Sequence, residues 1–235
     1  MSYKKRLDGR KFDELREIEA ELGVVPNANG SAKFRFGETV AIAAVYGPKP
    51  LHPQHMQNPE KGIVRCFYDL LSFSVTERKR PGPSRRSQEI SKVTEWALSP
   101  VIDLGEFPNT VVDVHIMITQ ANASTRCAGI NAAALALAQA GVPMKEMISS
   151  VSVGKIDDKI VVDLTKEEED YEDSEGFKAT DIPMAFTSNS KNLTLLQLDG
   201  VLQLDKMKEA IEMGRKACEE IYKVQKELLK ETKEE

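Results

Sequence analysis

Residues 124–140 constrain the fold most, because nearly all of their side chains are small, around Leu135 and Leu137. Gly141 and Pro143 follow in the order expected just beyond the C-terminus of a helix. The segment is therefore predicted to be a helix. Its small side chains let a helix pack very closely against a sheet.

Alternation of apolar and polar residues predicts strands on both sides of this helix. Ile18, Ala20 and Leu22 alternate with glutamates, which is the period-two pattern of a half-buried strand. The same kind of analysis predicts strands over 18–22, 32–36, 39–45, 63–74, 112–119, 148–153, 160–164, 182–186 and 193–198, and further helices over 87–99 and from 204 onward. Residues 47–62 and the acidic stretch near 170 are predicted to be loops.

The order of these elements predicts the fold class and its division. Two stretches of β structure are each followed by a helix, with mixed hairpins in place of regular β-α-β alternation, so we expect an α+β fold. At about 150 residues per domain, a chain of 235 residues holds one large domain or two small ones. The predicted boundary divides the chain into two halves, residues 1–140 and 141–235.

Composition excludes several classes of protein. With 41% apolar and 29% charged residues the chain is expected to be globular and soluble, not disordered. Its longest apolar runs, 40–45 and 132–138, are far below the roughly 20 residues of a membrane span, so no membrane association and a cytoplasmic location are expected. Neither the three cysteines nor the three histidines have the spacing of a zinc site, so no metal site is expected.

The net charge of −5 conceals two opposite clusters. Five of the nine residues 78–86 are basic, and seven of the nine residues 167–175 are acidic. The basic cluster is either a solvated loop or, because prolines restrain it in an extended form, a binding segment for a phosphodiester backbone. The acidic cluster is either a solvated loop or a source of a carboxyl group with a raised pKa that donates a proton or helps to hold a divalent cation. Asp181 is a second candidate for that role.

Ser124, Thr125 and Arg126 form a candidate anion site. They follow a strong strand and open the small-residue helix, so hydroxyls, backbone N–H groups and a guanidinium would converge at the positive end of a helix dipole. The alternative is an ordinary Ser/Thr helix cap beside an exposed arginine. The residues alone leave both interpretations open.

Several collinear blocks together resemble the ribonuclease PH family over about residues 6–227. The blocks are Arg6-x-Asp8-Gly9-Arg10, Asp13-Glu14-Leu15-Arg16, Gly30-Ser31-Ala32, Ala43-Ala44-Val45-Tyr46-Gly47-Pro48, Ser84-Arg85-Arg86 and Ala138-Gln139-Ala140-Gly141-Val142-Pro143-Met144. Within the family, the likeness is greatest to the catalytic type of subunit of the archaeal exosome. The resemblance implies the ribonuclease PH fold, with mixed β-sheets packed against helices.

The resemblance also implies an activity: phosphorolytic 3′-to-5′ removal of nucleotides from RNA, which releases nucleoside 5′-diphosphates and runs in reverse to add RNA tails. Inorganic phosphate is then the co-substrate, and the resemblance leaves a requirement for Mg²⁺ open. By position, it assigns phosphate binding to Ser124, Thr125 and Arg126, and RNA backbone binding to Arg85 and Arg86.

The position of the catalytic acid is less sharply defined by the resemblance. Glu169-Asp170 and Asp181 match the family pattern best, with Asp170 as the first choice, and Asp173 competes because the segment 171–180 is longer than usual. The loop 51–55 corresponds to the entrance pore, where relatives often have arginine in place of Gln54. RNA contacts there are therefore expected to shift to His55 and Arg65, with Lys61 beside them.

The resemblance also implies an assembly. It is a hexameric ring in which this subunit alternates with a related inactive one and which is capped by RNA-binding subunits. The substrate of the ring is the 3′ end of single-stranded RNA. Three alternatives remain: a stand-alone ribonuclease PH that trims tRNA 3′ ends, a non-catalytic RNA-binding ring subunit, and metal-dependent hydrolysis that releases monophosphates.

Overall fold

A five-stranded sheet is built from the first part of the chain in the computed structural model, which describes residues 3–77, 79–172 and 178–231. Its strands lie in the order β1 (Ile18–Leu22), β2 (Gly30–Phe36), β3 (Thr39–Pro50), β5 (Thr110–Gln120) and β4 (Ile63–Leu70). Neighbours are antiparallel except β4 and β5, which are parallel and joined through helix α1 (Arg85–Leu98). The strands confirm the period-two predictions, whereas this one β-α-β crossover was not predicted.

A second, four-stranded sheet is built from the later part of the chain. Its strands are β6 (Ile148–Ile156), β7 (Lys159–Val162), β8 (Thr180–Thr187) and β9 (Leu193–Leu196), in the order β7-β6-β8-β9 and all antiparallel. The pairings β6–β7 and β8–β9 are the two predicted hairpins. β9 ends at Leu196, two residues before the predicted end.

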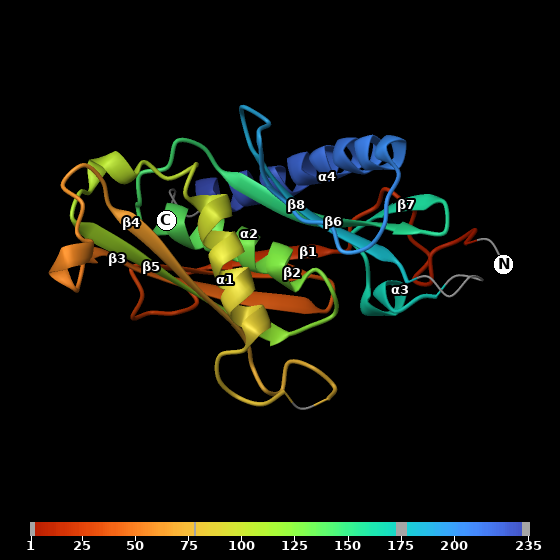
Figure 1. Cartoon of the computed structure of the whole chain (residues 1–235), viewed down its shortest axis with the longest axis horizontal. Coiled ribbons are helices and arrows are strands. Elements are labelled where there is room, and N and C mark those ends of the chain that lie inside the picture. Colours follow the sequence, from red (N-terminus) through yellow and green to blue (C-terminus); the bar gives the residue numbers. More distant parts are fainter. Residues whose placement is uncertain (1–2, 78, 173–177, 232–235) are drawn as a thin grey trace.

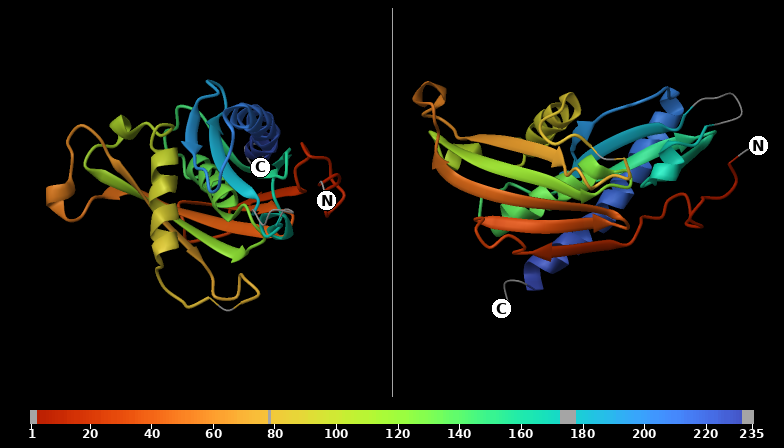
Figure 2. Two further views of the ribbon diagram at one scale, coloured as in Figure 1. Left: turned by 45° about the vertical axis from the view of Figure 1, so that its right-hand side comes forward. Right: turned by 90° about the horizontal axis from the view of Figure 1, so that it is seen from below.

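Helix α2 (Thr125–Gln139) lies between the two sheets and contacts β2, β3 and β6 (Figure 1). Gly30 of β2 comes so close to α2 that a Cβ on it would lie 2.3 Å from the carbonyl oxygen of Ala136. This contact confirms that the small-residue helix packs tightly on a sheet. Helix α4 (Leu204–Glu231) runs along β6 and reaches β1 (Figure 2).

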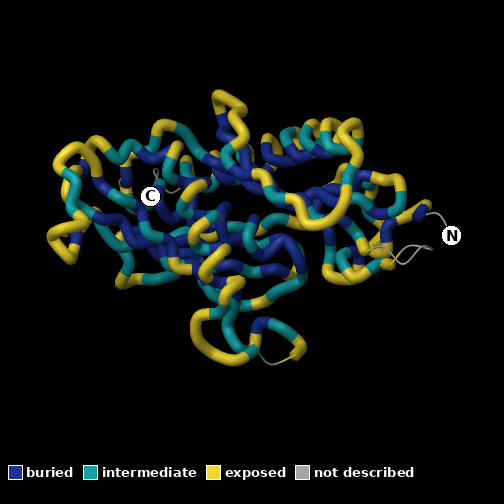
Figure 3. The backbone as a smooth tube through the Cα atoms, in the orientation of Figure 1, coloured by how far each residue is buried: buried dark blue, intermediate teal, exposed yellow. Residues whose placement is uncertain are grey.

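Large buried side chains from both halves of the chain join one hydrophobic core. Phe34 and Ile116 of the first sheet, Leu135 of α2 and Val151 of the second sheet all belong to it. Figure 3 shows buried backbone in both halves of the molecule. The fold is α+β with two sheets, as predicted from the element order. The division at residue 140 stays a prediction, because the core itself is continuous across it.

Several other segments also differ from the predicted elements, and β4 ends at Leu70, four residues before the predicted end. β3 extends to Pro50, into the predicted loop, which also contains the short 3-10 helix η1 (Gln54–Met56); a second, η2, spans Leu104–Glu106. α1 begins at Arg85, two residues earlier than predicted, because Ser84 and Ser87 form a capping box. The acidic segment contains the short helix α3 (Lys166–Glu169), which starts from a capping box between Thr165 and Glu168. Within the described residues, no helix has both the length and the apolar character needed to cross a membrane.

Candidate active site

A cleft of about 870 Å³ opens where the first turns of α1 and α2 meet α3 and the second sheet. Arg86 of α1, Arg126 of α2, Glu169 of α3 and Asp181 of β8 all line it. Arg126 of the candidate phosphate site, Arg86 as one of the three candidate RNA-binding arginines, and the candidate acids Asp170 and Asp181 therefore share one cavity, although they are far apart in the sequence. Ser124 and Thr125 do not line it.

The first turn of α2 starts from an unusual backbone. Ala123 and Ser124 both have left-handed conformations, with φ of 56° and 52°. The Ser124 hydroxyl does not cap the helix; it donates to Oδ1 of the buried Asp163 at 3.1 Å. The interpretation of Ser124 as an ordinary side-chain cap is therefore wrong.

Thr125 and Arg126 present polar groups at this helix end. The Tyr68 hydroxyl donates to Thr125 Oγ1 at 2.9 Å, and the helical ladder begins only with the bond from the Ala128 N–H to the Ser124 carbonyl. The amides of the preceding first-turn residues thus have no intrahelical acceptor. Together with the Arg126 guanidinium and the helix dipole, these groups suit an anion.

Arg126 is held by polar neighbours from two other elements. Its guanidinium donates to the side-chain oxygen of Gln197, and Gln197 donates in turn to Glu89 Oε1 of α1 at 2.9 Å. Arg126 also lies 3.9 Å from the same Glu89 oxygen. The guanidinium is therefore already directed into the cleft.

Asp181 is the candidate acid that the fold brings into the cleft from β8. Burial raises the pKa of its carboxyl, the charge of Asp199 adds to that rise, and a hydrogen bond from Ser152 together with Arg126 and Arg86 opposes it without cancelling it. A carboxyl group with a raised pKa beside two arginines suits a proton donor near a bound anion.

Glu169 is a functional candidate that the sequence analysis grouped with Asp170 but did not select. Burial raises the pKa of its carboxyl, and the charge of Asp181 raises it further. The capping box between Thr165 and Glu168 was the available signal, because it starts a helical turn that buries Glu168 and carries Glu169 to the cleft.

Asp170, the first-choice acid, lies at the cleft but in a different environment. Its side chain is 57% exposed and pairs with Lys166 at 2.9 Å. Asp170 is therefore solvated and ion-paired, whereas the Asp181 carboxyl is buried. Asp173 lies outside the described residues.

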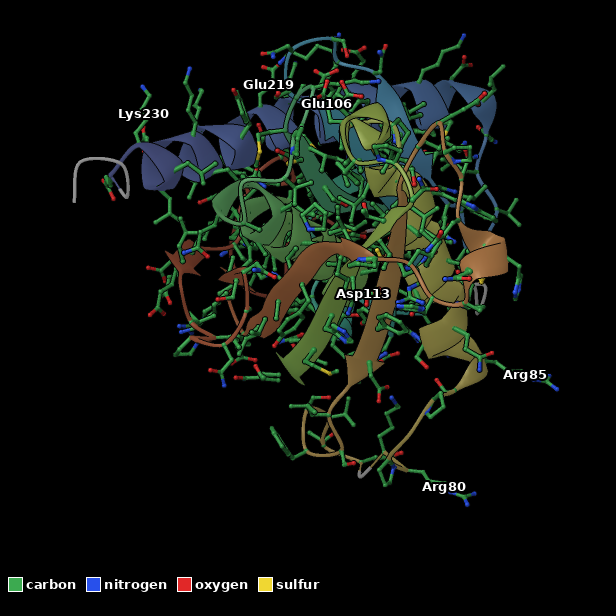
Figure 4. All side chains as sticks on the ribbon, turned by 90° about the vertical axis from the view of Figure 1, so that its left-hand side faces the viewer. Arg80, Arg85, Glu106, Asp113, Glu219 and Lys230 are labelled. Atoms are coloured by element: carbon green, nitrogen blue, oxygen red, sulfur yellow. The ribbon has the colours of Figure 1, made fainter. Side chains whose placement is uncertain are left out.

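The four candidate RNA-binding residues are divided by the fold. Arg86 lines the cleft, while Arg85, one residue earlier on the helix, is exposed and points away from the ribbon (Figure 4). Arg65 of β4 is held by Asp113 at 2.7 Å, and neither it nor His55 lines the cleft. His55 lies on η1, at the end of the long axis opposite α3 (Figure 1).

Comparison with known proteins agrees with this arrangement. The description "3′ exoribonuclease family, domain 1" matches residues 14–143, and "domain 2" of the same family, the RNase PH family, matches residues 146–217. The chain is 49% identical over 227 residues to the exosome complex component Rrp41 of Thermococcus kodakarensis, covering 97% of this chain and 89% of the relative. It is 44% identical over 226 residues to Rrp41 of Methanopyrus kandleri, covering 96% and 92%.

A solved structure is similar over almost the whole chain. The crystal structure of rice (Oryza sativa) Rrp46 matches with a TM-score of 0.82 and 25% sequence identity, covering 95% of this chain and 100% of that one.

Proposed function

Because the chain belongs to the 3′ exoribonuclease (RNase PH) family, we propose that it is the catalytic subunit of an exosome, a phosphate-dependent 3′-to-5′ exoribonuclease. It releases nucleoside 5′-diphosphates and, in reverse, adds tails to RNA from those diphosphates. The proposal draws on relatives named as exosome complex components.

One observation carries this function. The cleft holds Arg126 at the start of α2, Arg86 at the start of α1, and two carboxyl groups, Glu169 and Asp181, whose pKa burial raises. Phosphorolysis needs these groups together, because it brings two anions and a proton donor to one phosphorus atom.

Phosphate binds at the first turn of α2, held by Thr125, Arg126 and backbone N–H groups. One of its oxygens attacks the phosphorus of the terminal phosphodiester and forms the new P–O bond. The bond to the 3′ oxygen of the preceding nucleotide breaks, and the Asp181 carboxyl transfers its proton to that oxygen. The products are a nucleoside 5′-diphosphate and an RNA shorter by one nucleotide.

Arg86 and Arg126 supply the electrostatic part of the reaction. Phosphate and the RNA phosphodiester repel one another, and the two guanidinium groups that line the cleft offset that repulsion. Ser124 is assigned to shaping the turn at this site, since its hydroxyl is engaged with Asp163.

Mg²⁺ is not given a step in this mechanism. In the part of the chain that the structure describes, no group of three or more His, Cys, Asp and Glu side chains is spaced to hold a metal ion. The described residues therefore do not form a metal centre of their own, and each step above uses only the chain's own groups and inorganic phosphate.

The chain is further proposed to act in a cytoplasmic hexameric ring that alternates it with a related inactive subunit and is capped by RNA-binding subunits. RNA enters as a single-stranded 3′ end, and His55 on η1, Arg65 on β4 and Arg85, the neighbour of Arg86 on α1, are proposed to contact it on the way. A ring with a local positive channel is compatible with the net charge of −5, because RNA need not meet a positive surface elsewhere.

Product identity tests the proposal. The chain, alone and with its ring partner, is incubated with a 3′-tailed single-stranded RNA, with and without inorganic phosphate, and the released nucleotides are identified. Diphosphates that appear only with phosphate are expected. Monophosphates without phosphate would show hydrolysis, and no product in either setting would favour a non-catalytic subunit.

Asp170→Asn serves as the matched control for Asp181→Asn in this assay. Both changes remove one carboxylate at the same cleft, but only Asp181 has the buried environment of a proton donor. Loss of diphosphate release in Asp181→Asn and its retention in Asp170→Asn are expected. The opposite pattern would return the acid role to Asp170.

A further inference from the structure

Asp163 is a fully buried carboxylate next to the phosphate site that the proposed mechanism does not use. It follows β7 directly and is 0% exposed. Its Oδ1 accepts from Ser124 at 3.1 Å and from the Arg16 guanidinium at 2.6 Å. Its Oδ2 accepts from the Arg16 backbone N–H at 2.9 Å and from Arg16 Nε at 2.8 Å.

Burial opposes ionisation of Asp163, but its hydrogen bonds and ion pair with Arg16 outweigh burial and keep its pKa below the usual range. The carboxylate is therefore charged at neutral pH. Burying two charges costs desolvation free energy, so a buried ion pair is weak evidence for a purely stabilising role. The groups that this pair holds in place therefore bear on its function.

What it holds is the turn before α2. Arg16 donates from its third nitrogen to the Asn122 carbonyl at 2.6 Å, and the Thr39 hydroxyl lies 2.8 Å from the carbonyl oxygens of both Asn122 and Ala123. The next residue is Ser124, which is tied to the carboxylate itself. The left-handed conformation is unfavourable for residues other than glycine, so two such residues in succession persist only where neighbours enforce them.

We propose that Arg16 and Asp163 form a positioning pair for the phosphate site, acting through Ser124 to hold the left-handed turn that starts α2 and places Arg126 in the cleft. This inference rests on the proposed function. It also gives Ser124 a defined part: its hydroxyl proton is committed to Asp163, so it shapes the site and does not donate to phosphate.

The same carboxylate residue connects the phosphate site to the acid. The Asp163 N–H donates to the Ser152 carbonyl at 2.7 Å, and the Ser152 hydroxyl donates to Asp181. Hydrogen bonds thus connect Asp163 both to the phosphate site, through Ser124, and to the proton donor Asp181, through Ser152.

The test measures initial rates of diphosphate release against phosphate concentration at saturating RNA, in the assembled complex, for Ser124→Ala, Asp163→Asn and the double variant. Each single change is expected to raise the KM for phosphate about tenfold, the effect of losing one charge-assisted hydrogen bond. The double variant is expected to go no further than the larger single effect, because both changes break the same connection. The KM for RNA is expected to stay within about twofold of wild type, since no contact with RNA is lost.

Arg16→Lys adds a variant that keeps the buried positive charge but not the forked geometry, so the inference stays testable if Asp163→Asn fails to fold. It is expected to raise the phosphate KM less than Asp163→Asn does. Additive effects of Ser124→Ala and Asp163→Asn, or an unchanged phosphate KM with a lower kcat, would overturn the inference, because loss of folded protein alone lowers kcat only.

Glu168→Gln is the matched control. Glu168 is also 0% exposed and accepts from Arg6 and Tyr3, but it has no bond to the α2 turn. It is expected to lower the unfolding temperature without changing the phosphate KM. An equal rise of phosphate KM in this variant would show general loosening and overturn the inference.

A binding measurement separates this inference from the proposed function. Inorganic phosphate is expected to raise the unfolding temperature of the wild-type chain and to lose that effect in Ser124→Ala. If the wild type is stabilised in this way but releases no diphosphates, the function fails and the positioning pair stands. If diphosphates are released but Ser124→Ala responds to phosphate as the wild type does, the pair fails.

Discussion

Tyr68 on β4 donates its hydroxyl proton to Thr125 Oγ1 on the first turn of α2, across 2.9 Å. Burial raises the pKa of Tyr68 to about 12, so the phenol stays a donor throughout the range of an ordinary assay. Because this bond occupies one lone pair of the Thr125 hydroxyl, the hydroxyl keeps its own proton to donate at the first turn of α2.

Tyr68→Phe is therefore expected to raise the KM for phosphate about threefold to tenfold with little change in kcat, as the loss of one neutral hydrogen bond predicts. The change keeps the ring that packs in the core. Steady-state rates at varied phosphate check it, and a lower kcat at constant phosphate KM would contradict it.

Asp181→Asn is expected to lower kcat about 100-fold or more, the usual contribution of a general acid. Binding of RNA should remain, because the change removes a proton donor and not an anchor. Single-turnover rates with pre-bound RNA measure the chemical step. A rate within threefold of wild type would exclude Asp181 as the acid.

The pH dependence of kcat should move in opposite directions in two variants. A general acid works while protonated, so kcat falls as pH rises through its pKa. The Ser152 hydrogen bond lowers the Asp181 pKa, so Ser152→Ala should move this alkaline limb to higher pH. Asp199 is the like charge that raises the Asp181 pKa, so Asp199→Asn should move the limb to lower pH. Full profiles of kcat against pH measure both shifts. A shift of the alkaline limb in the same direction in both variants would contradict the assignment of that limb to Asp181.

Arg86→Gln should weaken RNA binding and reduce the slope of log Kd against log salt by about 0.7, the value for one phosphate contact on a single strand. Arg85→Gln is the comparison variant in the isolated chain, and a smaller loss is expected from it because Arg85 does not line the cleft. Titrations of labelled RNA at several salt concentrations measure both slopes. Equal losses would show that the exposed arginine contributes as much as the one in the cleft.

The Glu168 carboxylate should make the fold sensitive to acid. Burial raises its pKa, but hydrogen bonds from Arg6, the Thr165 N–H and Tyr3 outweigh burial and lower the pKa below the ordinary 4.5. A lowered folded-state pKa contributes stability above the unfolded value and loses it as pH falls through the folded one.

Glu168→Gln is thus expected to cost about 3 kcal/mol at neutral pH, because it leaves a buried arginine without its partner. Below pH 4.5 the difference from wild type should shrink, since wild type loses the same contribution there. Urea unfolding at several pH values measures this convergence, and a constant difference would contradict the assignment.

Local patterns in the sequence were sufficient for most of the fold. A strand or helix must turn its apolar face to the core. This requirement fixes which face is buried in the alternating strands 18–22 and 112–119, and it predicts a buried helix from the small side chains of 124–140. The parallel pairing of β4 and β5 could not be predicted, since pairing direction depends on where α1 returns the chain.

The candidate site was only partly predictable. Ser124, Thr125 and Arg126 follow a strand and open a helix, so their position was visible in the sequence. The choice between Asp170 and Asp181 could not be predicted, because both are aspartates in adjoining segments. They differ in burial and in hydrogen-bond partners, which the sequence does not show.

The sequence by itself determined the elements, the family and the set of groups available for catalysis, since these depend on neighbours along the chain. Only the tertiary structure decided which group meets which. It buried Asp181 beside Ser152, turned Arg86 into the cleft and Arg85 out of it, and committed the Ser124 hydroxyl to Asp163. Desolvation and hydrogen-bond partners come from segments distant in sequence, and these set the pKa and orientation on which the chemistry depends.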